Sequence, residues 1–279
     1  MKHVSVLLEE SINGLNIKSD GIYVDMTLGY GGHSSEILRR LKNGFLYAFD
    51  KDIDACRYSN ERLSKISNNF KIFNTANINI KTCLEKEQVY KVDGILFDLG
   101  VSSVELDEKE RGFSYMKDAR LDMRMDQSSE FSAYDVVNSY SLEELTKIFQ
   151  VYGEEKNSFK IAKKIVERRQ ISPIETTLEL VDIIDEAIPF RDKKTTGHPA
   201  KKVFQAIRIE VNNELEELKQ ALKTSLELLN VNGVICVISF HSLEDRIVKN
   251  IFKEVSEIDP FIKGLPNIDK NLLPDYEII

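Results

Sequence analysis

The sequence predicts an α/β protein with a Rossmann-like, mostly parallel sheet that has helices on both faces and an inserted all-helical region. Short apolar runs recur as strands, and stretches of helical periodicity separate them, as in repeated βαβ units. The first strand ends in a Gly-rich turn at residues 29–32. The alternation stops near residue 107 and resumes near residue 199, with no convincing strand between.

The first part of the chain contains four strand signals. The clearest is Val92–Phe97, an apolar run that leads into Asp98. In chain order we expect a helix at 4–17, a strand at 22–26, a helix at 34–42, a strand at 45–49, a helix at 52–66, a strand at 71–73, a helix at 80–88 and a strand at 92–97. Each strand therefore has neighbouring helices that can cover a parallel sheet.

Helix start signals mark the inserted region. Ser132, Ser141 and Thr176 are each followed three residues later by an acid, which is the pattern of a capping box. These signals and the apolar periodicity predict helices at 133–139, 142–151, 157–169 and 177–188. We therefore divide the chain into a first sheet segment at 1–106, a helical insertion at 107–198 and a second sheet segment at 199–279.

The second sheet segment repeats the βα pattern once. It begins with a long helix or helix pair over 203–229. A turn at 231–233 then leads into a strand at 234–238, and the polar segment Ser239–Arg246 opens a helix that runs to about residue 255. Residues 256–279 are weakly patterned, so no further element is predicted there.

Composition excludes several classes of protein. With 42% hydrophobic and 30% charged residues among 279, the chain is of the soluble globular type. No apolar run approaches the ~18 residues that span a membrane, and the first residues lack the apolar core of a signal peptide. Cys56, Cys83 and Cys236 are few and widely spaced, so we expect buried thiols in a reducing cytoplasm and no metal site.

The charge distribution is uneven. The net charge of −8 argues against a general nucleic-acid binder. Two stretches are nevertheless basic, because residues 156–169 and 191–208 each carry six Lys or Arg against one acid. Such runs are often only solvated faces. On an acidic protein a local basic face also suits one defined RNA site, and the sequence leaves both interpretations open.

The Gly-rich turn predicts a nucleoside site. Glycine allows a backbone to turn sharply or to touch a ligand, and Asp50 at the end of the next strand can accept the ribose hydroxyls of an adenosine. The turn lacks the third Gly of the dinucleotide fingerprint, and the chain has no phosphate-binding loop. Asp25 suits a cationic ligand better than a pyrophosphate. A tight turn without a ligand is the alternative.

Dense motifs are spread over about residues 3–255. They are His3-x-x-Val6-Leu-Leu-x-Glu10, Gly29-x-Gly-Gly-His-Ser34, Asp98-Leu-Gly-Val-Ser-Ser103, Arg111-Gly-Phe-Ser-Tyr115, Leu121-Asp-Met-Arg-Met-Asp126, Tyr152-Gly-Glu-Glu155, His198-Pro-Ala with Phe204-Gln-Ala, and Ser239-Phe-His-Ser-Leu-Glu-Asp-Arg246. In this order they resemble the S-adenosylmethionine-dependent methyltransferases that act on the N4 of a cytidine in small-subunit (16S-type) ribosomal RNA near the decoding site.

This resemblance implies S-adenosylmethionine as the cofactor and ribosomal RNA, free or in the assembled small subunit, as the partner. The family's cofactor positions correspond to Gly31, Gly32, His33, Asp50, Asn77, Asp98 and Glu105. Asn77 replaces a residue that is usually aromatic, and Glu105 replaces a usual Gln. The family's N-P-R-x-R-S-x-x-L-R segment does not occur, so the last strand or strands of the sheet are in question.

The chemistry of an exocyclic amine sets what the site must supply. The N4 amine is a poor nucleophile, so the site needs an acceptor for its hydrogens and a route for the departing proton, but no covalent cysteine. We expect Asp98, Ser102 and His241 to be catalytic, and Phe113 or Tyr115 could stack on a splayed-out base. The alternatives are structural: a turn acceptor, a satisfied histidine and core aromatics.

The residues expected to bind RNA are Arg124, Lys163, Lys164 and Arg168. For Arg124 the alternative is an internal salt-bridge cluster with Arg111 and the nearby acids. Competing functions are a methyltransferase for another RNA or a protein amine, a non-catalytic ribosome-assembly factor and, disfavoured by the missing Gly, a nicotinamide-dependent oxidoreductase. The oligomeric state is left open, with a homodimer as one option.

Overall fold

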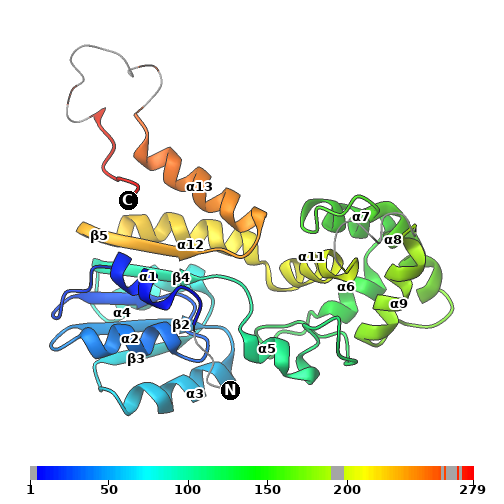
Figure 1. Cartoon of the computed structure of the whole chain (residues 1–279), viewed down its shortest axis with the longest axis horizontal. Helices are drawn as coiled ribbons and strands as arrows, with labels where there is room; N and C mark the ends of the chain where they lie inside the picture. The colour runs from blue at the N-terminus through cyan, green and yellow to red at the C-terminus, as the bar shows by residue number, and fades with distance from the viewer. Residues whose placement is uncertain (1–4, 190–197, 259–260, 262–268, 270–271) are drawn as a thin grey trace.

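A computed structural model describes residues 5–189, 198–258, 261, 269 and 272–279. A parallel five-stranded sheet lies at its centre, with the strand order β3-β2-β1-β4-β5. The strands in Figure 1 are β1 (Ile22–Asp25), β2 (Phe45–Asp50), β3 (Phe70–Asn74), β4 (Val92–Asp98) and β5 (Leu229–Ile238). The predicted α/β class with a Rossmann-like parallel sheet is confirmed.

Helices cover both faces of the sheet, as apolar parallel strands require. One face carries α1 (Leu8–Gly14), α2 (Gly32–Arg40) and α3 (Ile53–Ser64). The other carries α4 (Ile80–Lys86), which follows the 3₁₀ turn η1 (Asn77–Asn79), together with α12 (Glu214–Leu228) and α13 (Ser242–Ser256). The sheet and these helices are called the sheet part below. No helix among the described residues is long and apolar enough to cross a membrane.

The helical part lies beside the carboxyl edge of the sheet (Figure 1). It consists of α6 (Ala133–Ser139), α7 (Leu142–Val151), α8 (Ser158–Arg169), α9 (Thr177–Ala187) and α11 (Ala200–Asn212). The predicted capping boxes at Ser132, Ser141 and Thr176 are all formed. The described residues of 107–198 contain no strand, only an isolated bridge between Arg120 and Thr176. A separate apolar core holds the helices together.

A single residue joins the two parts at their second crossing. α11 packs in the helical core and α12 packs on the sheet, so the expected element over 203–229 is a helix pair. Between them, Asn213 is left-handed, with φ of 52° and ψ of 36°. The Asn212 side chain fixes this corner by donating to Met123 O and accepting from Met125 N, each at 2.8 Å. The domain division stays a prediction, and the packing of α11 favours a second boundary at Asn213.

β5 enters the sheet irregularly. Val92 pairs with Leu229 and Gly94 pairs with Val234, so residues 230–233 bulge out of the ladder. The turn expected at 231–233 is therefore wrong as a separate element, because it lies inside a longer strand. The described residues that follow α13 contain no further strand.

The start of the chain also departs from the prediction. The helix expected at 4–17 is only α1, because Leu7 (φ 47°) and Asn16 (φ 46°) adopt left-handed conformations that end a helix. Val6 and Leu7 are exposed, so they do not belong to an apolar helix face. His3 and the basic residues Arg191, Lys193 and Lys194 lie outside the described residues.

Candidate active site at the carboxyl edge of the sheet

Three neighbouring strands end in acids at one edge of the sheet. Asp25 ends β1, Asp50 ends β2 and Asp98 ends β4, and β1 lies between the other two strands. Parallel strands bring their carboxyl ends to one edge, which is where open α/β sheets bind ligands. In Figure 1 this edge faces the helical part. The structure therefore brings the predicted residues Asp50 and Asp98 to one site.

Asp25 shapes the Gly-rich turn from inside. It is 1% exposed, its Oδ1 accepts from Thr27 N at 3.1 Å and its Oδ2 accepts from Ser34 Oγ at 2.7 Å. Burial raises its pKa. The expectation that Asp25 faces a cationic ligand is wrong, because both oxygens bind the turn. Above it, Gly29 and Gly31 have φ of 47° and 75°, which a side chain would strain.

Asp50 lies between this turn and α3. Its Oδ2 accepts from Gly29 N at 2.7 Å, and its Oδ1 accepts from Asp52 N at 2.8 Å. Burial raises the pKa of Asp50 to about 7, and the nearby carboxylates of Glu105 and Asp52 add to the shift. Each oxygen has a further lone pair, so the carboxylate can also accept hydroxyl groups of a ligand.

Asp98 is held on one side and unpaired on the other. Its backbone N–H donates to Thr27 Oγ1 at 2.6 Å, and its Oδ2 lies 3.4 Å from Nδ1 of His33. Its Oδ1 is buried and has no hydrogen-bond partner. Such an atom is costly unless a ligand completes it. Asp98 is therefore the acid at this edge with an oxygen left to accept a hydrogen bond from a ligand.

His33 is buried behind Asp98. Its Nε2 lies 3.1 Å from Val6 O, so each ring nitrogen faces an oxygen acceptor. Burial alone would lower the pKa of His33, but the hydrogen bond to Asp98 and the charges of Asp25 and Asp98 raise it overall. A protonated ring can donate to both acceptors at once. When protonated, His33 places a positive charge behind the carboxylate of Asp98.

This edge fits S-adenosylmethionine. A Cβ built on Gly29 would meet nothing closer than Thr27 O at 4.0 Å, so a ligand can approach the turn. Asp50 offers acceptors for hydroxyl groups, and the carboxylate of Asp98 at the end of β4 favours a cationic group at the same edge. A nucleoside with a positively charged tail satisfies both. The residues that would hold it are Gly31, Gly32, Asp50 and Asp98, with His33 behind.

The loop after β4 is closed by a capping box. Ser102 Oγ accepts from Glu105 N at 3.1 Å, and Glu105 Oε2 accepts from Ser102 N at 2.7 Å, at the start of α5 (Ser103–Asp107). The catalytic role of Ser102 and the cofactor role of Glu105 stay predictions, and both side chains already serve this cap. Asn77 begins η1, just after β3, and is half-buried.

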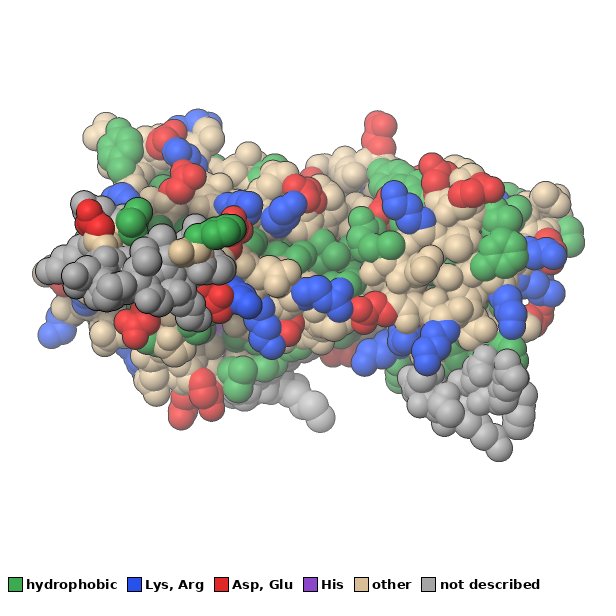
Figure 2. Space-filling view, turned by 90° about the horizontal axis from the view of Figure 1, so that it is seen from above, with side chains coloured by type: hydrophobic (Ala, Val, Ile, Leu, Met, Phe, Trp, Pro, Cys, Tyr) green, Lys and Arg blue, Asp and Glu red, His purple; other side chains and the backbone are tan. Residues whose placement is uncertain are grey.

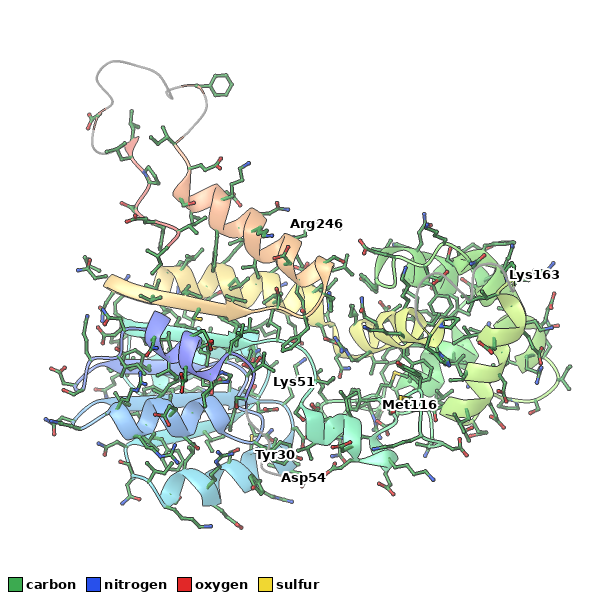
Figure 3. All side chains as sticks on the ribbon, in the orientation of Figure 1. Tyr30, Lys51, Asp54, Met116, Lys163 and Arg246 are labelled. Atoms are coloured by element: carbon green, nitrogen blue, oxygen red, sulfur yellow. The ribbon has the colours of Figure 1, made fainter. Side chains whose placement is uncertain are left out.

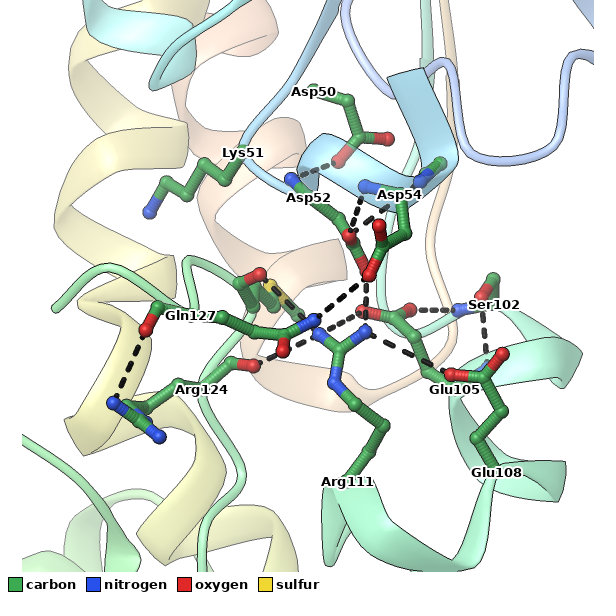
Figure 4. Close-up of polar contacts among 12 residues, drawn as sticks. Asp50, Lys51, Asp52, Asp54, Ser102, Glu105, Glu108, Arg111, Arg124 and Gln127 are labelled. Atoms are coloured by element: carbon green, nitrogen blue, oxygen red, sulfur yellow. Dashed lines mark hydrogen bonds and ion pairs between the residues drawn. The ribbon is translucent and has the colours of Figure 1, made fainter. Parts of the chain in front are cut away.

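Arg111 ties the loop after β4 to the start of α3 (Figure 4). Its Nη1 lies 2.5 Å from Asp52 Oδ2, and its Nη2 lies 3.9 Å from Glu105 Oε1. Nη2 also donates to the carbonyls of Arg124 and Met125. Asp52 in turn caps α3 and bonds Asp50. A buried chain of contacts therefore runs from Asp50, the carboxylate expected to accept the ribose hydroxyls, to the loop that follows Asp98.

Comparison with known proteins decides the family. The profile of the MraW methylase family matches residues 1–279. The chain belongs to the MraW methylase family. It is 53% identical over 278 residues to the ribosomal RNA small subunit methyltransferase H of Exiguobacterium sibiricum, covering 100% of this chain and 89% of that protein. Proteins of the same name in Clostridium botulinum strain Loch Maree and Clostridioides difficile are 57% and 56% identical, covering 92% and 91% of this chain and 82% of each relative.

Membership in the MraW methylase family confirms the resemblance inferred from the motifs. It also confirms the predicted cofactor, S-adenosylmethionine, and the class of enzyme, a methyltransferase. The seven cofactor residues taken from the resemblance are distributed over the observed edge. Gly31, Gly32 and His33 lie at the turn and the start of α2, and Asp50 and Asp98 end β2 and β4. Asn77 begins η1, and Glu105 completes the cap of α5.

The residues expected to bind RNA are mostly paired inside the protein. All three guanidinium nitrogens of Arg124 donate, to Asp122 and to the carbonyls of Gln127 and Ser129. Lys164 and Arg168 pair with Glu186 at 3.3 and 3.1 Å. Lys163 lies at the end of the helical part that is far from the sheet (Figure 3). Arg124 thus belongs to an internal salt-bridge cluster, which was the alternative to RNA binding. The RNA contacts of the four residues stay predictions.

The predicted aromatic and histidine residues also have structural partners. Phe113 is 6% exposed in the helical core, and the ring of Tyr115 stacks on His198 at 4.9 Å. His241 is the N-cap of α13 and accepts from Glu244 N at 3.4 Å. Its Nε2 is buried, lies 3.2 Å from Glu244 Oε1 and forms no hydrogen bond. The core alternative therefore holds for Phe113, and a catalytic role of His241 stays a prediction.

A polar cavity of about 440 Å³ extends this edge toward the helical part. It is lined by Lys51, by Asn74 and Thr75 after β3, and by the corner residues Asn212 and Asn213. Lys51 spans it, donating to Asn212 O at 3.1 Å and pairing with Glu217 at 2.6 Å. A second cavity of about 310 Å³ lies wholly beside the helical part, around Arg120 and Arg124.

Sequence reasoning missed the contacts that join distant segments. The pairing of Arg111 with Asp52 crosses 59 residues and no local pattern predicts it. A signal existed for Asp52, which precedes a helical pattern as an N-cap residue does. The cap made by His241 was hidden because the usual start signals use Ser, Thr, Asp or Asn. The acid three residues later, Glu244, was the available signal.

Proposed function

We propose that this chain transfers a methyl group from S-adenosylmethionine to the exocyclic N4 of a cytidine in small-subunit ribosomal RNA. The observation that carries the proposal is the buried, unpaired Oδ1 of Asp98 beside the Gly-rich turn. Relatives that are 53–57% identical over at least 91% of this chain are named for methylation of small-subunit ribosomal RNA, which supports the substrate.

Asp98 is the residue that acts on the amine. Bound S-adenosylmethionine supplies an electrophilic methyl group on a positively charged sulfur. The N4 lone pair of cytosine is delocalised into the ring, so the amine must be turned and held. Oδ1 of Asp98 accepts one amino hydrogen, which directs the lone pair away from the ring. Carbonyls of the loop after β4 are available for the other hydrogen.

His33 orients the carboxylate of Asp98. Its Nδ1 lies 3.4 Å from Oδ2, so the ring fixes one oxygen and leaves the other for the amine. As the new N4–methyl bond forms and the bond from sulfur to the methyl group breaks, the proton that leaves N4 passes to Oδ1 of Asp98, which acts as the general base. The histidine positions Asp98 and does not touch the base.

A covalent cysteine takes no part in this chemistry. Cys56 is a thiol near the site, with its Sγ 3.6 Å from Asp50 O. Burial raises the pKa of Cys56 to about 12, so its thiolate is scarce at neutral pH. Direct attack of the amine on the methyl carbon therefore agrees with the residues present.

The RNA reaches Asp98 between the sheet part and the helical part, because the carboxyl edge opens in that direction (Figure 1). On the upper face, Lys and Arg side chains alternate with Asp and Glu across both parts (Figure 2). Mixed charge of this kind suits a shaped RNA site better than non-specific binding. We also propose that the protein is cytoplasmic, and a homodimer stays one option for its oligomeric state.

The test uses small ribosomal subunits from cells that lack this protein. The purified chain is incubated with these subunits and methyl-labelled S-adenosylmethionine, and the RNA is digested to nucleosides. We expect the label in N4-methylcytidine. Label in another nucleoside or in protein would assign a different acceptor, and cofactor binding without any transfer would favour an assembly factor. The same assay on naked ribosomal RNA tells which form is the substrate.

A further inference from the structure

Phe240 lies beside the carboxyl end of β4, and its ring is more than half exposed. It follows β5, and the ladder places Ile238 opposite Asp98, with Leu99 N donating to Ile238 O at 3.0 Å. Phe240 is 55% exposed. It belongs to none of the three apolar cores found among the described residues and to none of their ring pairs.

The backbone of Phe240 is fixed although its ring is exposed. Its N–H donates to Glu244 Oε2 at 2.8 Å, and Glu244 is itself 3% exposed. The ring lies against the loop after β4, because a Cβ built on Gly100 would stand 3.5 Å from Cδ2 of Phe240. Gly100 has a φ of 92°, a conformation that disfavours any side chain. Gly100, the neighbour of the Phe240 ring, has no side chain that could cover it.

The aromatic residues considered from sequence do not offer such a surface. Phe113 is buried and Tyr115 is stacked on His198. A base that leaves its RNA stack loses a π-face contact, and an exposed aromatic ring can return it. Hydrophobic side chains are visible on the upper face where the two parts meet (Figure 2).

We propose that the Phe240 ring is the platform on which the target cytosine stacks, next to Asp98 and Gly100. The proposal rests on the proposed function and adds the residue that binds the base. The ring takes the flat face of the cytosine while Asp98 takes its amine, so the two contacts together place N4. Stacking is tolerant of base identity, and the contact of Asp98 with the amine favours cytosine.

Three substitutions of Phe240 distinguish a ring that stacks on the base from a side chain that only fills apolar space. F240L keeps an apolar side chain but removes the π-face, whereas F240Y and F240W keep a ring. With small subunits as substrate, we expect F240L to lower kcat/KM by about tenfold to a hundredfold, mostly through KM, and F240Y and F240W to stay within about threefold of the wild type. Calorimetry should show unchanged affinity of all variants for S-adenosylmethionine, and melting should show unchanged stability.

The matched control is Y90L. Tyr90 is 65% exposed and lies just before β4, at the opposite edge of the sheet, so its loss should not change kcat/KM. Wild-type activity of F240L, or equal loss in F240L, F240Y and F240W, would overturn the stacking role. If the wild type itself forms no N4-methylcytidine, the proposed function fails first and the platform with it.

Discussion

At the carboxyl edge of the sheet, two partly buried acidic side chains have no Lys or Arg paired with them among the described residues, whereas several basic side chains between β4 and α11 are paired with neighbouring acids. Asp98 Oδ1 has no partner, and the pKa of Asp50 is raised to about 7. In the helical part, Arg124 is bound to Asp122, and Lys164 and Arg168 are bound to Glu186.

This difference separates two tasks. Polar groups that are left incomplete in a folded protein mark the place where a ligand completes them. Groups that satisfy one another stabilise a shape. The chemistry therefore belongs to the sheet part, and the helical part provides a wall that the RNA meets. The buried pair of Arg111 and Asp52 ties the segment that leads from β4 to the helical part onto the start of α3, so its contribution to stability can be measured apart from catalysis.

The largest effect is expected from Asp98→Ala. Removing the acceptor of the amine should lower kcat by about a thousandfold, within the range known for general base catalysis. Methyl transfer to small subunits under saturating cofactor measures it. Asp93→Ala is the control, since Asp93 lies at the opposite end of the same strand, where its side chain contacts Lys18, the backbone of Ile22 and Asn230. Turnover of Asp98→Ala near that of the wild type would remove Asp98 from the mechanism.

The second largest effect is expected from Arg111→Met, which should lower the stability of the fold. Arg111→Met leaves Asp52 buried and without its cation, because the two side chains are 8% and 3% exposed. We expect the free energy of unfolding in urea to fall by about 3–5 kcal/mol. Lys71→Met removes the exposed pair with Glu87 and should cost less than about 1 kcal/mol. Equal effects of the two variants would mean that the buried pair contributes no more to stability than an exposed one.

The third effect depends on pH. Because burial raises the pKa of Asp50 to about 7, the folded protein without cofactor should lose stability as pH rises from the ordinary value of 3.8 through 7. Cofactor binding needs the carboxylate, so affinity for S-adenosylmethionine should rise about tenfold between pH 6 and 8. Calorimetry at a series of pH values measures this. In Asp50→Asn the affinity should be weak and independent of pH, and an unchanged slope there would assign the titration to another group.

The smallest effect is expected in the helical part. Charge reversal of Lys163 and Lys164 should weaken RNA binding by about threefold and reduce its salt dependence, while cofactor affinity stays unchanged. The effect is small because Lys163 lies far from the sheet (Figure 3). Filter binding with Lys81→Glu as the control, an exposed lysine of α4, provides the comparison. No change relative to that control would place the RNA path closer to the sheet edge.

The elements predicted well from sequence depend on local chemistry. Apolar runs located β1, β2 and β4 almost to the residue, because both faces of a parallel sheet are buried. The acids three residues after Ser132, Ser141 and Thr176 located three helices, because a capping box uses only neighbours in the chain. The cofactor edge followed from both, together with the family resemblance.

The elements predicted poorly depend on contacts that sequence spacing does not encode. The pattern of apolar residues could not show that Leu7 is left-handed or that Phe240 is exposed, because both look like core positions. Arg111 is a motif residue whose partner Asp52 is set by the arrival of one loop over another. Val231–Gly233 carries a turn signal, yet pairing on either side of it keeps the strand continuous as a bulge.

The pairing of β4 with β5 also has a consequence for biosynthesis. β4 receives its outer neighbour only after all of the helical part and α12 have been translated. We expect the helices between them, whose contacts are close in the chain, to fold on the ribosome while the sheet still has an open edge. Completion of the catalytic edge, including Phe240, would then come after the helical part has folded, so a shorter nascent chain would lack the surface for its target base.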